Sequence, residues 1–192
     1  QRFNFSAEYI IWARKCEKVA HFFNYDLMTA LNNGVHMPDV WKLPAPGTWE
    51  KVCGKHPTQK PLRLLYRIIS ASTRVGETIL DPFAGSCTTG IAANLMDRRF
   101  IGIEHDARFI ELGKKRKEEL SNPDRAIEMY LRMSENPEEV QVLVNHVRPE
   151  LLNLMIEKGI TYMRAGDSKG SVLVTPGFER MGYVLLHTNG EN

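Results

Sequence analysis

Residues 78–104 combine a glycine-bearing turn with an acidic residue at a spacing that suits adenosine binding. The short apolar run 78–80 ends at Asp81, and the turn that follows contains Gly85. A helix-forming stretch and a second apolar run then lead to Glu104, 19 residues after Gly85. In a βαβ unit, backbone N–H groups at such a turn and a carboxylate about 20 residues later hold an adenosine and its ribose hydroxyls. The spacing therefore predicts an adenosine site at Gly85 and Glu104.

Other nucleotide sites fit the same residues less well. The turn is not a G-x-G-x-x-G fingerprint, and a glycine between strand and helix is often only a turn. No Gly-Lys-Ser/Thr follows Gly85, which disfavours a P-loop. A nicotinamide-binding oxidoreductase would need the full glycine fingerprint and an acid/base cluster, and the sequence shows neither.

Three motifs in residues 56–104 resemble those of a known family. Residues 56–61 read HPTQKP, residues 81–90 read DPFAGSCTTG, and residues 101–104 read IGIE. Their types and order resemble the S-adenosylmethionine half of the β-class (permuted) amino-DNA methyltransferases, which modify adenine N6 or cytosine N4 in bacterial and phage DNA. The resemblance covers roughly residues 6–118. Residues 8–15, 23–26 and 39–41 look most like GATC-type adenine methylases.

This resemblance implies an α/β fold, a partial Rossmann-like methyltransferase sheet over residues 1–122, and S-adenosyl-L-methionine as cofactor. It places the Thr58 hydroxyl and the Lys60 ammonium at the methionine carboxylate, where a helix N-terminus also favours an anion. It places Glu104 on the ribose hydroxyls and Phe83 against the cofactor or the target pocket. The implied cofactor-binding residues are His56, Thr58, Lys60, Asp81, Phe83, Ala84, Gly85, Ser86, Thr88 and Glu104.

The family also has a catalytic Asp/Asn/Ser-Pro-Pro-aromatic motif, which this sequence lacks. Residues 81–83 belong to the cofactor turn, and residues 175–178 (TPGF) do not fit the motif. Because the chain starts with Gln1 and not Met, we expect it to be part of a longer protein whose catalytic residues precede it. No catalytic residue is therefore assigned within residues 1–192.

Cys87 departs from the family, which usually has glycine at this position. If that glycine has a positive φ, a cysteine costs roughly 1 kcal/mol there. If the glycine only makes room, the thiol would crowd the cofactor. In either case we expect Cys87→Gly to tighten cofactor binding.

Residues 16–55 lie where the family recognises its target. Their prolines and glycines indicate irregular backbone. Interleaved cations and aromatic rings suit phosphate contacts and base stacking. An alternative is a loop held by its own aromatic side chains. The candidate DNA-binding residues are Trp41, Lys42, Trp49, Lys51 and Lys55.

Local patterns predict the elements around these motifs. Residues 8–15 are typical of a strand, and a helix follows residues 56–61 with Thr58 as its cap and Pro61 in its first turn. Residues 62, 65, 68 and 69 should face the sheet from that helix. A further helix should begin at Asp106, and the run 114–117 (KKRK) is expected at a solvated helix end rather than in a DNA patch.

Residues 123–192 show no recognised family. The pattern predicts helices over 124–159 that are divided at Pro149, followed by strands at 160–163, 171–174 and 183–186. We expect a small α+β appendage, which could bind DNA or a partner subunit or serve as a structural cap.

Composition narrows the class of protein. The net charge is only +2, so a nucleic-acid surface must be local. The three cysteines are widely spaced, which is typical of a protein in a reducing cytosol and does not indicate a metal site. The sequence contains no apolar run of 18 residues, so we expect no membrane span. We expect a cytoplasmic protein of a bacterium or phage. Its expected partners are DNA and the N-terminal catalytic part of the same protein, and the resemblance also allows a homodimer.

The sequence therefore predicts transfer of methyl from S-adenosylmethionine to adenine N6 in DNA. Two alternatives stay open, a cytosine N4 methyltransferase and a non-catalytic (decayed or split) module that binds cofactor or DNA.

Overall fold

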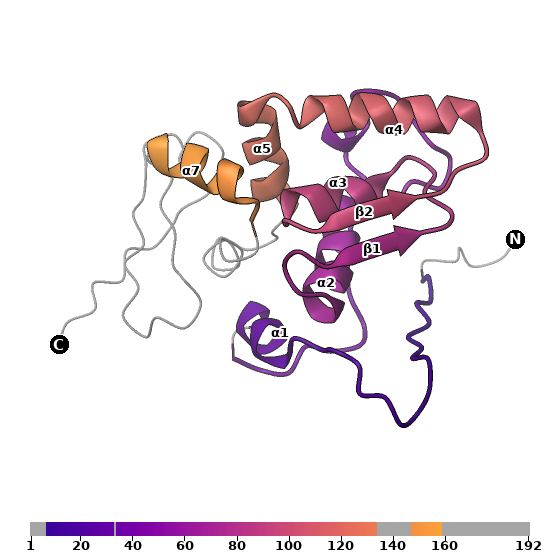
Figure 1. Cartoon of the computed structure of the whole chain (residues 1–192), viewed down its shortest axis with the longest axis vertical. Helices are drawn as coiled ribbons and strands as arrows, with labels where there is room; N and C mark the ends of the chain where they lie inside the picture. The colour runs from indigo at the N-terminus through magenta and orange to yellow at the C-terminus, as the bar shows by residue number, and fades with distance from the viewer. Residues whose placement is uncertain (1–6, 33, 134–146, 159–192) are drawn as a thin grey trace, which may run out of the picture.

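The computed structural model describes residues 7–32, 34–133 and 147–158 (Figure 1). Its core is one βαβ unit surrounded by helices. In chain order the elements are α1 Tyr25–Leu31, the 3₁₀ helix η1 Thr48–Glu50, α2 Leu62–Ser72, β1 Thr78–Asp81, α3 Thr88–Leu95, β2 Arg99–Gly102, α4 Ala107–Glu119, α5 Pro123–Met133 and α7 Pro149–Glu157.

Strands β1 and β2 form a two-stranded parallel sheet. Thr78 pairs with Arg99 at one end and Asp81 with Gly102 at the other, and α3 makes the crossover between them. In Figure 1 the strands lie in front of α2 and α3. The opposite face of the sheet presents Leu80, Ile101 and Ile103, whose side chains are more than half exposed. The arrangement is part of a Rossmann-like sheet, as the sequence predicts.

The core lies behind the sheet because the apolar residues of α2 and α3 recur at helical spacing. Leu62 and Ile69 of α2 are buried, and Leu65 packs against the same core, as predicted. Ile91 and Leu95 of α3 are also fully enclosed. Complete burial of one such side chain contributes about 1.5–3 kcal/mol.

Two glycines let α3 and the turn after β1 approach β2 closely. The Phe100 ring lies against both Gly90 of α3 and Gly102. A Cβ atom at either glycine would be 2.6 Å from a ring carbon. Gly90 of the TTG motif is therefore required for packing, independently of any ligand.

A buried arginine connects the two turns that precede β1 and β2. Arg98, which is 5% exposed, donates from Nη1 to the Met96 carbonyl (2.5 Å), from Nη2 to the Thr73 carbonyl (3.0 Å) and from Nε to the Thr73 hydroxyl (3.2 Å). It ties the turn before β1 to the turn before β2 at the end of the sheet opposite Gly85.

The predicted strand at residues 8–15 is wrong. This segment forms no strand in the structure, and Tyr9, Ile11 and Trp12 are 95%, 90% and 65% exposed. A strand needs a neighbour for its hydrogen bonds. Among the residues that the structure describes, β1 and β2 pair only with each other.

The predicted cap of α2 is also wrong. The helix begins at Leu62 with Pro61 at the N-cap position, and Thr58 makes no cap bond. Oε2 of Glu50 accepts the Leu62 N–H at 2.8 Å instead. The cap is supplied by a residue 12 positions earlier, which local sequence signals do not reveal.

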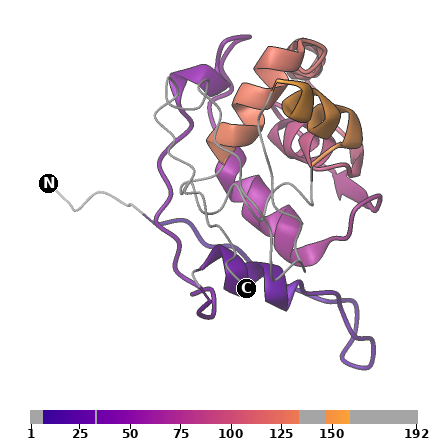
Figure 2. The same cartoon turned by 90° about the vertical axis from the view of Figure 1, so that its left-hand side faces the viewer.

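Helices α5 and α7 confirm the helical pattern predicted after residue 123. They lie side by side (Figures 1 and 2), and their buried side chains join the same apolar core as those of α2 and α3. The domain boundary at 122 stays a prediction, and the three predicted strands after residue 159 lie outside the described residues. No helix in the described ranges is long and apolar enough to cross a membrane.

Candidate cofactor site

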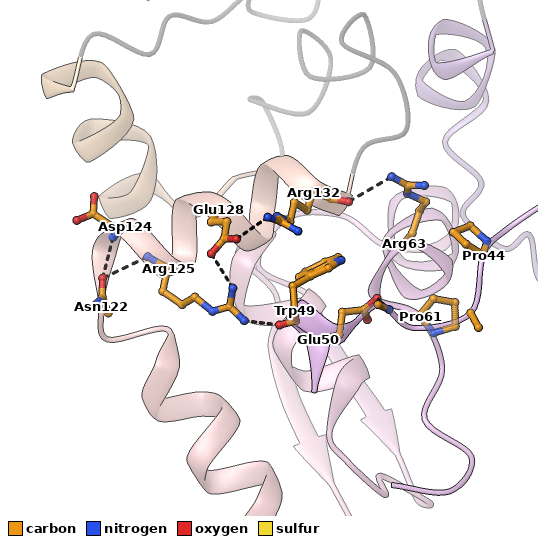
Figure 3. Close-up of a pocket in the computed structure, with 12 residues that line it drawn as sticks. Pro44, Trp49, Glu50, Pro61, Arg63, Asn122, Asp124, Arg125, Glu128 and Arg132 are labelled. Carbon is orange, nitrogen blue, oxygen red and sulfur yellow. Dashed lines mark hydrogen bonds and ion pairs between the residues drawn. The ribbon is translucent and has the colours of Figure 1, made fainter. Parts of the chain in front are cut away.

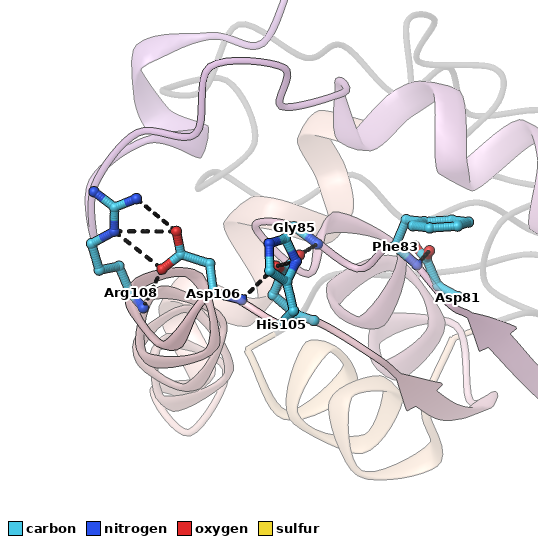
Figure 4. A network of polar contacts seen from close by, with 7 residues as sticks. Asp81, Phe83, Gly85, His105, Asp106 and Arg108 are labelled. Atoms are coloured by element: carbon cyan, nitrogen blue, oxygen red, sulfur yellow. Dashed lines mark hydrogen bonds and ion pairs between the residues drawn. The ribbon is translucent and has the colours of Figure 1, made fainter.

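The turn after β1 is held by the carboxylate that ends the strand. Oδ1 of Asp81 accepts the Phe83 N–H at 3.0 Å (Figure 4), and Oδ2 accepts the Thr89 hydroxyl at 2.6 Å. The two bonds fasten the turn to both β1 and the first turn of α3. Asp81 therefore shapes the loop from the carboxyl end of the sheet, where ligands of open α/β sheets bind.

Gly85 and Glu104, whose spacing in the sequence predicts a common site, are in direct contact. The Gly85 N–H donates to Oε2 of Glu104 at 2.9 Å, and the Asp106 N–H donates to Oε1 at 2.9 Å. These backbone donors, that of Asp106 foremost, lower the pKa of Glu104. The carboxylate is thus ionised at neutral pH. Its Oε1 also lies 3.2 Å from Nδ1 of His105, while Oε2 retains acceptor capacity for a hydroxyl group.

Residues 56–60 lie against this turn. The His56 ring packs edge-on against Phe109 of α4, with centroids 4.1 Å apart, and its Nδ1 lies 3.2 Å from the Thr58 N–H, which donates to it. Gly85 has φ +51°, and a Cβ atom there would lie 3.2 Å from Nε2 of His56. A side chain would fill the space between the two loops, so the glycine is needed for both conformation and room.

Phe83 and Lys60 lie at the open side of the site. Phe83 is 88% exposed, which excludes a core role in the described structure, and Figure 4 shows its ring projecting from the turn. Lys60 donates to the Glu8 carboxylate at 2.5 Å, and both side chains are substantially exposed. Both residues are accessible to a ligand.

Ala84, Ser86 and Thr88 form the inner side of the turn and are all buried. The Ser86 and Thr88 hydroxyls lie 3.2 Å apart and face inward. Their assignment as cofactor-binding residues stays a prediction; in this structure the two hydroxyls contact each other inside the turn.

The sequence did not predict the residue that holds this inner side. Arg116 of α4 is 1% exposed, and its Nη1 donates to the Ser86 carbonyl at 2.6 Å and to the Thr88 hydroxyl at 2.8 Å. The prediction of a solvated run at 114–117 holds for its three lysines and is wrong for Arg116. Leu112, Arg116 and Leu120 recur every four residues, and that spacing was the available signal of a common buried face.

Cys87 adopts the left-handed conformation (φ +58°), so the first of the two alternatives for this position holds. Its thiol packs against Gly113 of α4. A Cβ atom at Gly113 would be 2.5 Å from Sγ. Burial raises the pKa of the Cys87 thiol, which favours its neutral form. The side chain contacts α4 below the turn.

The candidate DNA-binding residues are spread over one long loop. Trp41 donates to the Pro38 carbonyl and lies 5.7 Å from the Arg67 guanidinium. Trp49 packs on the core, and its carbonyl accepts from Arg125. These contacts agree with the alternative of a loop held by its aromatic rings, while Lys42 and Lys55 are exposed and Lys51 is half-buried.

Trp49 also lines a cavity of about 790 Å³ between α5, η1 and the start of α2 (Figure 3). The Arg132 guanidinium lies 5.4 Å from its ring. None of the predicted cofactor residues lines this cavity. No group of three or more His, Cys, Asp or Glu that could hold a metal occurs in the described part of the chain.

Comparison with known proteins decides the family. The family model N6_N4_Mtase, described as DNA methylase, matches residues 1–115, more than half of the chain. The chain belongs to this family. The resemblance drawn from the sequence is confirmed, and S-adenosyl-L-methionine is the cofactor that goes with it.

Curated relatives agree with this assignment. Type II methyltransferase M2.MboI of Moraxella bovis is 58% identical over 119 residues, which are 62% of this chain and 44% of that protein. M2.DpnII of Streptococcus pneumoniae is 53% identical over 117 residues, covering 60% and 44%. M.HinfI of Haemophilus influenzae is 31% identical over 172 residues, covering 87% and 44%. The chain spans less than half the length of these relatives.

Among solved structures, the M1.HpyAVI–SAM complex is 38% identical to this chain, with a TM-score of 0.41 over 52% of this chain and 45% of that one. PvuII DNA methyltransferase, described as cytosine-N4-specific, is 21% identical with a TM-score of 0.44. The roles of the individual site residues stay predictions.

Proposed function

We propose that the protein containing this chain transfers a methyl group from S-adenosyl-L-methionine to adenine N6 in DNA, and that this chain supplies the cofactor-binding half. The contact of Glu104 with the Gly85 turn carries the proposal. It joins an ionised carboxylate to a glycine loop at the carboxyl ends of parallel strands, in a chain of the DNA methylase family. The GATC-type resemblance of residues 8–15, 23–26 and 39–41 favours adenine over cytosine.

The residues present fit the cofactor. The space kept open by Gly85 lies beside Glu104, whose Oε2 retains acceptor capacity for a ribose hydroxyl. The exposed Phe83 ring can cover the adenine, and Thr58 and Lys60 can receive the methionine carboxylate once Lys60 leaves Glu8. The cofactor supplies an electrophilic methyl group. The residues of this chain would bind and orient it, and no acid or base for the transfer is assigned among the residues that the structure describes.

The open face of the sheet suits the catalytic part of the same protein. Leu80, Ile101 and Ile103 present apolar side chains that are 61%, 55% and 55% exposed. Parallel sheets are normally covered on both faces. Because the chain spans 44% of its relatives' length, we propose that the N-terminal part lies on this face and brings the Pro-Pro motif to the site.

DNA is the proposed substrate, with residues 16–55 as the recognition segment and Lys42 and Lys55 as its accessible cations. A bacterial or phage protein acting on DNA would work in the cytoplasm. Homodimer formation is a further untested proposal.

A methyl-transfer assay tests the function. The complete protein should incorporate tritiated methyl from S-adenosylmethionine into DNA that contains GATC sites, and nuclease digestion followed by chromatography should recover the label as N6-methyladenine. Label in N4-methylcytosine would establish the alternative target base. Cofactor binding without any methyl transfer by the complete protein would establish the non-catalytic module.

A further inference from the structure

Two buried charged residues lie behind the two loops of the cofactor site. Glu50 is 5% exposed and Arg116 is 1% exposed. Neither belongs to the motifs at 56–61, 81–90 or 101–104. Burial of a charged side chain is costly, so each should make specific contacts that compensate.

Glu50 holds the loop that carries His56 and Lys60. Its Oε2 accepts the Leu62 N–H at 2.8 Å, and its backbone carbonyl accepts Nε2 of the buried Gln59 at 3.0 Å. Its Oε1 accepts the Gly47 N–H at 3.2 Å. The segment 56–61 is thus fastened at its carboxyl end to one carboxylate residue.

Arg116 holds the other loop. Its Nη1 donates to the Ser86 carbonyl and to the Thr88 hydroxyl, directly below Gly85. Its Nε and Nη2 are buried and have no hydrogen-bond partner among the described residues. Burial lowers the pKa of Arg116, while the negative charges of Glu50 and Glu119 act in the opposite direction. The contacts that hold the guanidinium in its buried position are therefore those with Ser86 and Thr88.

We propose that Glu50 and Arg116 are positioning residues: Glu50 fixes the 56–61 loop and Arg116 fixes the 84–88 turn. The proposal rests on the proposed function, because the cofactor would lie between these loops. The two residues contact no ligand. They act through Leu62 and Gln59 on one side and through Ser86 and Thr88 on the other.

Each substitution leaves backbone groups of its own loop without their buried partner, which is costly. Loss of Glu50 should therefore displace the 56–61 loop, and loss of Arg116 should displace the 84–88 turn. Each loss should weaken cofactor binding, because the cofactor would contact both loops.

Calorimetry with S-adenosylhomocysteine on the complete protein is the test. Glu50→Gln and Arg116→Met should each weaken binding about tenfold, as expected for loss of a buried hydrogen bond to a charged group. The double variant should bind more weakly than either single variant. Arg116→Lys, which keeps the charge and a donor, should recover part of the affinity and replaces Arg116→Met if that variant does not fold.

Arg98→Met is the matched control. Arg98 is equally enclosed and bonded to turn carbonyls, but at the opposite end of the sheet. It should lower the melting temperature and leave the dissociation constant within about twofold, because Arg98 bonds to Thr73 and Met96 and to neither loop of the site. Unchanged affinity in the Arg116 variants, or equal losses in Arg98→Met, would overturn the proposal.

A second readout needs no ligand. The Cys87 N–H donates to the Ala84 carbonyl within the turn that Arg116 supports. Arg116→Met should therefore speed hydrogen–deuterium exchange of the Cys87 amide, measured by peptide mass spectrometry, more than Arg98→Met does. If the wild-type protein binds no cofactor, the proposed function fails, and the amide exchange rates still decide whether Arg116 holds the turn.

Discussion

Because Cys87 contacts Gly113, the effect of Gly113→Ala on the free energy of unfolding should depend on which residue occupies position 87. Alanine is favoured over glycine within a helix by about 1 kcal/mol, so Gly113→Ala alone would stabilise an isolated α4. In this protein the new Cβ atom would lie 2.5 Å from Sγ of Cys87 and 3.1 Å from its Cβ. Because both atoms are too close, rotation of the thiol cannot relieve the overlap by itself.

The magnitude follows from these opposing terms. Overpacking of this kind costs about 1–3 kcal/mol. Gly113→Ala should therefore destabilise the wild-type chain by about 1 kcal/mol after the propensity gain. In the Cys87→Gly background the clashing atoms are absent, and the same substitution should stabilise by about 1 kcal/mol. The expected coupling energy is about 2 kcal/mol.

Urea unfolding of the four chains, followed by circular dichroism, measures this coupling. The midpoints should shift in opposite directions in the two backgrounds while the slopes stay constant. The same loss of free energy of unfolding from Gly113→Ala in both backgrounds would refute the packing of the thiol on α4.

Three further predictions concern the turn, α4 and the missing motif. Cys87→Gly should tighten cofactor binding by no more than about fivefold, because the thiol faces α4 and only backbone strain is released; calorimetry that shows weaker binding or a larger gain contradicts this geometry. The Arg108 side chain lowers the pKa of Asp106 to about 2. The stabilisation of α4 by the Asp106 N-cap should be complete above pH about 4 and lost as the pH falls through about 2. The difference in melting temperature between wild type and Asp106→Ala should therefore shrink over that interval and not at higher pH. Residues 1–192 alone should transfer no methyl to DNA, and tritium incorporation above background by the isolated chain would contradict the placement of the catalytic residues outside it.

Much of the βαβ unit could be predicted because its signals are local. The apolar runs at 78–80 and 100–103, the glycine turn and the start of a helix at Asp106 all appear in the structure where the sequence places them. The spacing of Gly85 and Glu104 predicted a contact that the structure contains. The residues that predict these elements and this contact all lie within about 20 positions of one another in the sequence.

What could not be predicted depends on contacts between distant segments. A strand at 8–15 requires a neighbour that the local pattern does not supply. Glu50 caps a helix that begins 12 residues later. Arg116 is buried because it lies on the face of α4 that packs against the core, although its neighbours in the sequence are exposed lysines. The conformation of Cys87 was one of two alternatives, and only the position of α4 shows where the thiol lies.

The central claim is that Glu104 and the Gly85 turn bind the cofactor, and isothermal calorimetry of S-adenosylmethionine with the complete protein tests it most directly. Glu104→Ala removes the acceptor for the ribose hydroxyls and releases the Gly85 and Asp106 N–H groups, so the dissociation constant should rise on the order of thirtyfold. Glu118→Ala removes an exposed carboxylate of α4 and serves as the control, with affinity unchanged. Equal affinity of the wild type and Glu104→Ala would contradict the site.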